Sequence, residues 1–370
     1  KAIKKQIEKN YLGLHKKYFT LMNSKSVEFQ AFPNQIIHWY RQNPRDLPWR
    51  GTTDPYLIWL SEIILQQTRV AQGLPYYYAF SQTYPTVKDL ALAPESEVLR
   101  LWQGLGYYSR ARNLHACAKW IWFEQNGVFP QTYDQLLLLK GVGSYTAAAI
   151  ASFAFGEAKA VVDGNVFRVL ARYFGLDSDI NSSKTKKEFE ALANQLIPKD
   201  NPAEFNQAMM DFGSRQCTPK NPSCETCPLV KTCFAHTHGL VNQLPVKINK
   251  VKVKDRKLNY LVIKCGTEWV WNKRSSGDIW EGLHDFPLQE KTKTLLSEMS
   301  DVKPIPKSYR HLLSHQRLVA EFAEVEFPSE KRQILYQWCE QEGYLLVSEK
   351  EIDELAKPKL IVNFLNDQGI

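Results

Sequence analysis

The chain has 370 residues, which is enough for two or three domains with hydrophobic cores. Its 47 Lys and Arg residues against 39 Asp and Glu residues give a formal charge of +8, which suits a polyanionic partner without requiring one. A run of about 18 apolar residues is absent, and the Lys-rich residues 1–28 contain no apolar signal-peptide core. We therefore expect a cytoplasmic protein with no membrane contact, whose seven cysteines are reduced thiols or metal ligands.

Hydrophobic periodicity divides the chain. After an N-terminal extension of residues 1–28, residues 29–235 read as successive helices separated by Pro and Gly, whereas residues 258–370 contain strand-like runs such as "LNYLVIKC" and "RLVAEFAEVEF". Residues 236–257 are rich in Lys and predict a linker that either follows a phosphate backbone or remains a solvated connector. We predict a multidomain protein with an all-α domain followed by an α+β domain.

A carboxyl group lies among apolar residues in the predicted helix "DPYLIWLSEIILQQT". Asp54 is typical of an N-cap, and Pro55 is typical of a first helical residue. Glu62 follows in the same helix with apolar residues one turn before and one turn after it. Such surroundings make ionisation costly, so Glu62 should stay partly protonated near neutral pH and serve as a general acid. The alternative is a glutamate on a solvated helix edge.

Two glycines join a leucine run to an alanine run in "LKGVGSYTA". Thr132 and Gln135 form a capping-box pattern that predicts a short helix ending at Gly141 and Gly143. Ser144 is suited to cap the next helix, whose first backbone N–H groups would then be free to bind an anion. A helix–hairpin–helix element binds a DNA phosphate through such N–H groups, independently of base sequence. An ordinary helical corner has a similar sequence pattern.

A second carboxyl group follows this element. Asp163 stands between an apolar run and Gly164 in "VVDGNVFRVLARYFG", a position typical of a helix N-cap. Capping alone would explain it.

Four of the seven cysteines fall within "CTPKNPSCETCPLVKTC". Cys217, Cys224, Cys227 and Cys233 are separated by six, two and five residues, so there is one C-x-x-C pair where a zinc ribbon normally has two. Four thiolates in one compact loop are also suited to a [4Fe–4S] cluster. From the spacing alone, zinc and an iron–sulfur cluster both remain open.

Seven motifs occur together in a characteristic order. They are "LPWR", "SEIILQQT", "GLGYYSRARNL", "GVGSYTA", "VDGNVFRVL", "FNQAMMDFG" and the cysteine loop. Over roughly residues 30 to 235 the chain resembles the adenine DNA glycosylases of the MutY type, which belong to the helix–hairpin–helix superfamily together with endonuclease III. The resemblance implies a [4Fe–4S] cluster on the four cysteines. It also implies flipping and removal of adenine paired with 8-oxoguanine, or with guanine, in double-stranded DNA.

The resemblance also implies roles for individual residues. Glu62 would protonate adenine, Asp163 would stabilise the positive charge on the sugar, and Tyr145 would line the same site. Trp49 and Arg50 match the adenine pocket, whereas Gln67, Thr68, Leu105 and Tyr107 match residues around 8-oxoguanine. Gln207 stands where some family members have Glu.

The predicted second domain resembles the family's C-terminal domain, which has a Nudix-like fold. The acidic Nudix box is absent after "SSGDIWEGLHDFP", so pyrophosphate hydrolysis is not expected. The run "RHLLSHQRL" matches the family's loop that reads 8-oxoguanine, with Ser314 and His315 in place and Leu313 where Phe is usual. A plain β-turn is the alternative.

Two other classes of protein share parts of this pattern. An endonuclease III-type glycosylase and lyase needs a lysine where this chain has Tyr145, and a non-catalytic DNA-binding protein would not need Glu62 and Asp163. We therefore predict a monofunctional adenine DNA glycosylase, monomeric and associated with the nucleoid.

Overall fold

The computed structural model describes residues 27–248, 253–292, 295, 302–313 and 315–370. The chain forms two compact units, one from residues 1–63 and 128–249 and the other from residues 64–127 and 250–370. The predicted succession of a helical part and an α+β part is confirmed. Among the described residues, no helix combines the length and apolar character needed to cross a membrane.

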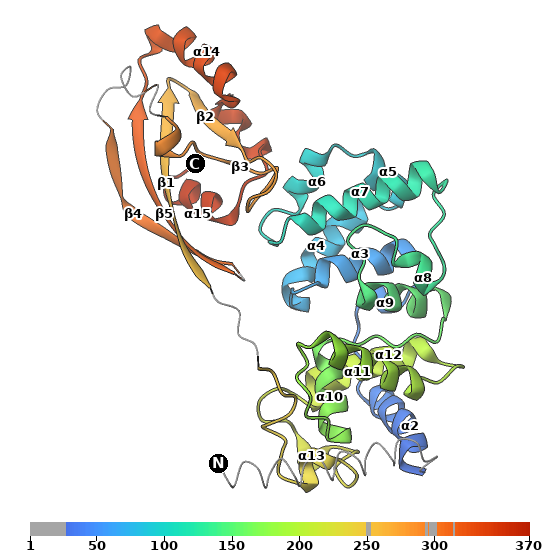
Figure 1. Cartoon of the computed structure of the whole chain (residues 1–370). Coiled ribbons are helices and arrows are strands. Elements are labelled where there is room, and N and C mark those ends of the chain that lie inside the picture. Colours follow the sequence, from blue (N-terminus) through green and yellow to red (C-terminus); the bar gives the residue numbers. More distant parts are fainter. Residues whose placement is uncertain (1–26, 249–252, 293–294, 296–301, 314) are drawn as a thin grey trace. The chain divides into compact units, whose positions relative to one another are not determined.

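The first unit is built from helices joined by short turns (Figure 1). The helices are α2 (Val27–Gln42), α3 (Pro55–Leu65), α8 (Tyr133–Leu136), α9 (Ser144–Phe155), α10 (Gly164–Phe174), α11 (Ser183–Leu196), α12 (Pro202–Asp211) and α13 (Phe234–Thr237). One core cluster of this unit joins α2, α10, α11 and α12 through Phe32, Leu170, Phe189 and Phe205. Complete burial of each such side chain stabilises the fold by roughly 1.5–3 kcal/mol.

Local sequence signals begin these helices where expected. The backbone N–H of Tyr56 donates to Asp54 Oδ1 at 2.8 Å at the start of α3. Thr132 and Gln135 form the predicted capping box of α8. The prediction for Ser144 was wrong, because Gly143 is the N-cap of α9 and Ser144 is its first residue. The first turn of α9 therefore begins without a side-chain cap.

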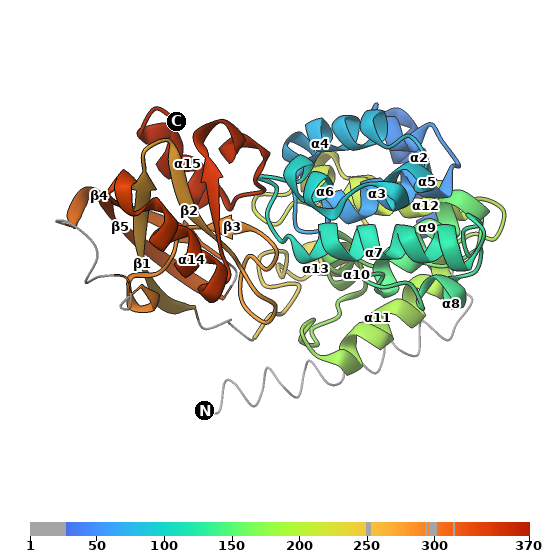
Figure 2. The same ribbon diagram turned by 90° about the horizontal axis from the view of Figure 1, so that it is seen from above.

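The second unit contains four helices from the middle of the chain and a sheet from its end (Figure 2). The helices are α4 (Val70–Thr83), α5 (Val87–Leu92), α6 (Glu95–Leu101) and α7 (Ser109–Glu124). The sheet comprises β1 (Lys254–Cys265), β2 (Glu268–Lys273), β3 (His284–Asp285), β4 (Lys303–Leu312), β5 (Gln316–Glu326) and β6 (Tyr344–Ser348).

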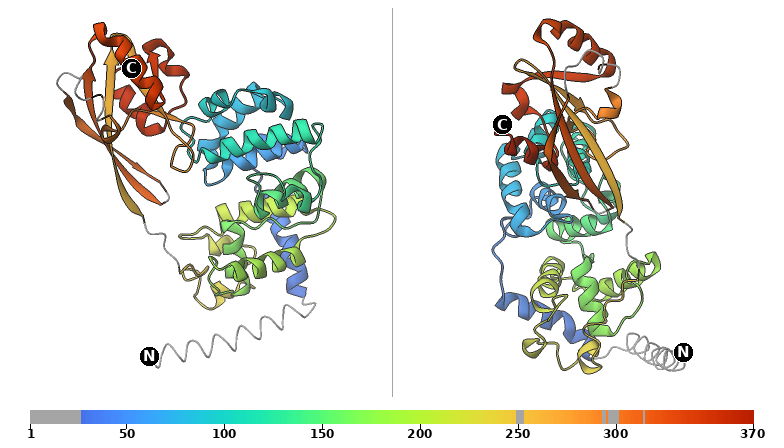
Figure 3. Two further views of the ribbon diagram at one scale, coloured as in Figure 1. Left: turned by 45° about the horizontal axis from the view of Figure 1, so that its top comes forward. Right: turned by 90° about the vertical axis from the view of Figure 1, so that its left-hand side faces the viewer.

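The strand order is β3-β2-β1-β5-β4, with β6 paired to β2. The long strands β1, β5 and β4 run beside one another in both views of Figure 3. β1 and β5 pair in parallel, and the other pairs are antiparallel. Because successive side chains of a strand face opposite sides, Tyr260 packs with α15 (Lys359–Asp367) whereas Ile263 packs with α14 (Arg332–Glu342). The sheet is thus covered by a helix on each face.

Candidate active site and DNA interface

Glu62 is buried inside α3, with 7 % of its surface exposed. Burial raises the pKa of its carboxyl group from 4.5 to about 7. A hydrogen bond with Tyr145 and the charge of Arg50 oppose this rise, whereas the negative charge of Asp163 adds to it. The apolar neighbours seen in the sequence therefore produce the expected surroundings, and Glu62 is partly protonated at neutral pH.

Asp163 is the N-cap of α10, as predicted. Its Oδ1 accepts hydrogen bonds from the backbone N–H groups of Asn165 and Val166, both at 2.8 Å, and its Oδ2 accepts one from Asn165 Nδ2 at 2.7 Å. Burial raises the pKa of Asp163, and these three donors oppose the rise. They also fix the orientation of the carboxylate.

Tyr145 lies between the two acids. It is the second residue of α9, and its hydroxyl group hydrogen-bonds with Glu62 and contacts Met210 Sδ at 3.4 Å. Burial, followed by the charges of Glu62 and Asp163, holds the pKa of Tyr145 well above its usual value. Three helices, α3, α9 and α10, therefore bring together a carboxyl group that can donate a proton, a carboxyl group that accepts three hydrogen bonds, and a neutral phenol.

Arg50 sits at the end of the short turn Pro48–Arg50 beside this group. Its two terminal nitrogens donate to the two carboxylate oxygens of Asp211 at 2.6 and 2.7 Å. Its guanidinium also lies over the ring of Tyr40, 5.6 Å from the centroid, and Tyr40 donates to Gln207 Oε1 at 2.9 Å. Trp49 belongs to the same turn.

Sequence reasoning missed Asp211 and Tyr40. The signal for Asp211 was its spacing from Gln207, because positions four apart lie on one face of a helix such as α12. Tyr40 is brought to this group from α2 and had no comparable local signal.

The residues expected around 8-oxoguanine fall in the second unit, in two strained turns. Gln67 and Tyr107 have φ angles of +56° and +49°, a left-handed conformation that costs a non-glycine residue roughly 1–3 kcal/mol. Tyr107 is 49 % exposed, whereas Leu105 is 4 % exposed and packs inward.

Arg110, which sequence reasoning also missed, ties these two turns together. It donates to the backbone oxygens of Ile64 and Gln66 at 2.8 and 2.7 Å, to Thr68 Oγ1 at 3.3 Å, and to the backbone oxygen of Gly106 at 3.2 Å. Burial lowers the pKa of Arg110 to about 10, so it stays charged at neutral pH. The turns that carry Gln67 and Tyr107 are therefore fixed by one cation.

The predicted hairpin lies between α8 and α9. Gly141 has a φ of +82°, which explains the need for glycine there, whereas Gly143 has an extended conformation with no atom within 4 Å of an added Cβ. Both glycines and Ser144 are exposed. The start of α9 is thus open to an anion such as a DNA phosphate.

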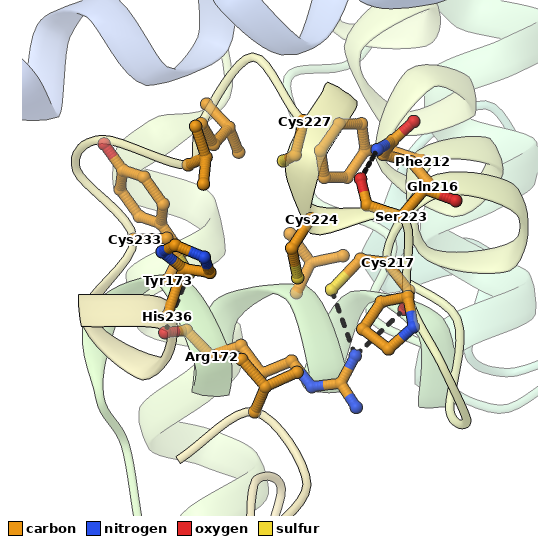
Figure 4. Close-up of a pocket in the computed structure, with 15 residues that line it drawn as sticks. Arg172, Tyr173, Phe212, Gln216, Cys217, Ser223, Cys224, Cys227, Cys233 and His236 are labelled. Atoms are coloured by element: carbon orange, nitrogen blue, oxygen red, sulfur yellow. Dashed lines mark hydrogen bonds between the residues drawn. The ribbon is translucent and has the colours of Figure 1, made fainter. Parts of the chain in front are cut away.

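The four cysteines of the loop line one pocket (Figure 4). Figure 4 shows the side chains of Cys217, Cys224 and Cys227 directed toward a common space. Arg172 donates to Cys217 Sγ at 3.3 Å, and all four thiols are free of disulfide bonds. Within the described part of the chain, no three His, Cys, Asp or Glu side chains converge as the ligands of a single metal ion do. Four free thiols around one pocket are a donor set that suits either zinc or an iron–sulfur cluster.

The last predicted element is the turn between β4 and β5. The backbone N–H of Leu313 donates to the backbone oxygen of Gln316 at 2.8 Å. The backbone N–H of Lys254 donates to the backbone oxygen of His315 at 3.0 Å. Ser314 lies outside the described residues, as do residues 1–26 of the N-terminal extension. His315 is exposed at the tip of the turn.

Comparison with known families matches both parts of the chain. Residues 60–199 match the HhH-GPD superfamily of base excision DNA repair proteins, and residues 259–367 match the NUDIX domain. The adenine DNA glycosylase of Buchnera aphidicola (subsp. Baizongia pistaciae) is 35 % identical over 296 residues, which cover 78 % of this chain and 84 % of the relative.

The human adenine DNA glycosylase is 45 % identical over 227 residues, or 59 % of this chain, and the match spans only 42 % of the human protein. A solved thermostable thymine-DNA glycosylase aligns with a TM-score of 0.54 and 34 % identity, covering 57 % of this chain and 97 % of that one. A solved covalent intermediate of endonuclease III with DNA aligns with a TM-score of 0.50 and 25 % identity, covering 57 % and 98 % of the two chains. The chain therefore belongs to the adenine DNA glycosylase family, whose helix–hairpin–helix glycosylase domain is joined here to a Nudix-like domain.

Proposed function

We propose that this protein removes adenine paired with 8-oxoguanine, or with guanine, from duplex DNA and leaves the strand uncut. The observation that carries the proposal is the pairing of Glu62, whose pKa is raised to about 7, with Asp163, whose carboxylate accepts three hydrogen bonds. Two carboxyl groups in different protonation states are what acid-assisted cleavage of a glycosidic bond requires.

Glu62 is the general acid of this proposal. Adenine is a poor leaving group as an anion, so a proton delivered to its ring, at N7, lets it depart neutral. The carboxylic acid form of Glu62 supplies that proton, and its pKa near the working pH favours the transfer. Because the bond is inaccessible within the stacked duplex, the adenine is flipped out of the helix before it reaches Glu62.

Asp163 stabilises the sugar after the bond weakens. The oxocarbenium-like centre carries positive charge, and a carboxylate already oriented by Asn165 and Val166 needs little reorganisation to face it. A water then adds to C1′ and loses a proton, which leaves the abasic site. Tyr145 remains neutral and keeps Glu62 in place by hydrogen bonding. Trp49 and Arg50 form the wall of the adenine pocket, and Asp211 fixes the guanidinium of Arg50.

The base opposite the adenine is read in the second unit. Gln67 and Thr68 on one turn and Tyr107 on the other contact the 8-oxoguanine, and the inward-packed Leu105 supports the second turn. Arg110 holds the two turns together. The half-exposed Tyr107 ring is suited to wedge beside a base. Ser314 and His315 read the modified base from the C-terminal domain.

Cys217, Cys224, Cys227 and Cys233 hold a [4Fe–4S] cluster in this proposal. When bound by these four thiolates, the cluster would give the loop a rigid centre. Lys220 and the neighbouring backbone are then presented to a DNA phosphate, and Gly141, Gly143 and the start of α9 bind another. The protein acts as a monomer on the nucleoid.

A cleavage assay on end-labelled duplexes tests the activity. Substrates carry A opposite 8-oxoguanine, A opposite G, T opposite G, or thymine glycol opposite A, and each reaction is run with and without alkali. We expect alkali-dependent cleavage at adenine in the first two duplexes only. Cleavage of thymine glycol without alkali would support an endonuclease III-type activity, and release of T opposite G would favour the specificity named for the thymine-DNA glycosylase. Binding without any base removal would contradict catalysis.

A further inference from the structure

The second unit contains a cavity of about 390 Å³, which Leu105, Tyr107 and His315 line together with residues that have no role above. Most of its lining comes from three segments of the same compact unit: the turn Gly104–Ser109, residues Asp278–Trp280, and His311, Leu312, Leu313 and His315 where β4 leads into β5. Its size is typical of sites for small organic ligands such as a nucleotide. Tyr107 and Trp280 supply aromatic surface, and Arg112 supplies a positive charge.

Trp280 is presented to this cavity by a strained loop. Its φ angle is +62°, a conformation that is unusual for a bulky residue and persists only where the surroundings enforce it. Backbone hydrogen bonds close this loop. The N–H of Arg274 donates to the oxygen of Leu283 and the N–H of Gly282 donates to the oxygen of Arg274, both at 2.9 Å. The N–H of Leu283 donates to the oxygen of Trp280 at 3.0 Å. The strain therefore lies at the residue that faces the cavity.

Arg274 enforces this loop conformation. Its Nε donates to the oxygen of Ile279 at 2.8 Å, and its guanidinium lies 5.8 Å from the centre of the Trp280 ring. Its other nitrogens bind Asp285 at 2.6 Å and Asp278 at 2.5 Å, and Arg256 binds both oxygens of Asp278 at 2.6 Å.

Asp285 is completely buried within this network. Buried ion networks add little net stability, so a role in fixing geometry is the better explanation for this one.

Two further contacts hold the loop from the other walls of the cavity. Arg112 of α7 donates to the oxygen of Glu281 at 2.5 Å and pairs with its carboxylate at 3.2 Å. The ring of His311 meets that of Trp280 edge-on, with the centroids 6.0 Å apart. The loop that carries Trp280 is thus held to the start of α7 through Arg112 and to the end of β4 through His311.

We propose that Trp280 is a stacking contact for a nucleotide of the DNA strand opposite the target adenine, and that Arg274 is its positioning residue. An indole face stacks on any base, and Tyr107 offers a second ring on the same cavity. Trp280 would hold this strand beside His311 and His315, which line the same cavity. The inference rests on the proposed function, since it assumes an adenine-containing duplex.

Photo-cross-linking and binding test this assignment. A duplex with 5-iodouracil beside 8-oxoguanine in the strand opposite the adenine should cross-link to Trp280, whereas the same label in the adenine strand should not. W280A should bind the duplex roughly 5- to 100-fold more weakly, the effect expected for one lost base–aromatic stack, and W280F should retain most of the affinity. D278N should weaken binding less, because Arg274 keeps Asp285.

Y336A is the matched control. Tyr336 is 41 % exposed on α14, which packs on the opposite face of the sheet from Trp280. It should change neither affinity nor cross-linking, and thermal unfolding should show that all variants fold. Wild-type affinity in W280A, or cross-linking in the adenine strand, would overturn the inference. These two measurements need no base removal, so they decide it separately from the proposed function, which fails instead if wild-type protein releases no adenine.

Discussion

Arg50 and Asp211 form a two-pronged ion pair, with N–O distances of 2.6 and 2.7 Å and side chains that are 12 % and 3 % exposed. The pair joins the turn after α2 to the end of α12 beside Glu62 and Asp163. The positive charge of Arg50 opposes the rise that burial causes in the pKa of Glu62. The ion pair should therefore affect both the free energy of unfolding and the rate of adenine release.

Replacing Asp211 should disturb both properties. D211A leaves the buried Arg50 without its partner and should lower the free energy of unfolding by roughly 3–5 kcal/mol. D211N keeps the shape and one acceptor, so it should fold, and adenine release should slow because Arg50 is held less firmly. Urea unfolding and single-turnover excision measure the two effects. E204Q, which breaks the exposed pair with Arg41, is the control and should leave excision unchanged.

The sequence predicts those parts of the site whose interacting residues lie close together along the chain. Asp163 was predicted as a cap because its partners are two and three residues away, and the four cysteines lie in one loop. Arg50 and Asp211 are 161 residues apart, and Arg110 bonds to an oxygen 46 residues away. The local pattern of the chain, such as the spacing of Asp211 from Gln207, does not show which distant residue is the partner, and these pairs form only when the helices pack.

Local patterns also fail to identify the N-cap of a helix where two neighbouring residues are both suited to that position. Ser144 matched an N-cap by residue type, but the backbone makes Gly143 the cap of α9. The strained φ angles at Gln67, Tyr107 and Trp280 had no signal in residue type, since glycine or asparagine is the usual occupant. Strain of this kind is enforced by contacts from elsewhere in the fold.

Glu62→Gln should abolish most base removal while leaving duplex binding intact. The amide preserves the shape of the side chain but has no acidic proton to give, and a positioned general acid contributes about 10²- to 10⁴-fold. Single-turnover excision and a filter-binding assay measure the two quantities. E188Q alters an exposed carboxylate on α11 and serves as the control. Rapid turnover by E62Q would remove Glu62 from the mechanism.

The same substitution should stabilise the protein at alkaline pH. The pKa of Glu62 is about 7 in the folded protein against an ordinary value of 4.5, so the unfolded chain loses this proton first as the pH rises. Wild-type stability should therefore fall between about pH 4.5 and 7, by roughly 3 kcal/mol, and stay constant above that. E62Q has no such loss, so its advantage in urea unfolding should be present at pH 8 and nearly absent at pH 4. An equal advantage at both values would mean that Glu62 ionises normally.

The pH dependence of excision should follow from the two acids. The reactive form needs Glu62 protonated, so the rate should fall about tenfold per pH unit above about 7. It also needs Asp163 ionised, so a second fall should appear at acid pH, displaced upward because burial raises the pKa of Asp163. Single-turnover rates on A opposite 8-oxoguanine, measured from pH 4 to 9, check both limbs. A rate that keeps rising above pH 8 is incompatible with Glu62 as the acid.

Replacing a loop cysteine should remove iron and weaken DNA binding together. Purified protein should contain about four iron atoms per chain with inorganic sulfide, and C224S should lose this content and bind duplex DNA less tightly. The control is C265A, because Cys265 is buried in the core of the sheet and is not among the residues that line the loop pocket. Zinc in place of iron, in a fully active preparation, would contradict the assignment.

Tyr145 determines what happens to the strand after the base has left. A lysine at this position would bring an amine to the sugar C1′, where it forms a Schiff base and allows strand cleavage, whereas a buried phenol with a strongly raised pKa is not a nucleophile at neutral pH. The wild-type product should be an intact strand with an abasic site that breaks only in alkali or heat, and borohydride should trap no covalent complex.

Y145K should gain trapping only weakly, because the lysine would lie beside Glu62 and Asp163, whose charges favour its protonated form. Y145F is the matched control, since it removes the hydrogen bond to Glu62 without adding an amine. Strand breaks without alkali in wild-type protein, at the rate of adenine release, would show that a different amine reaches C1′.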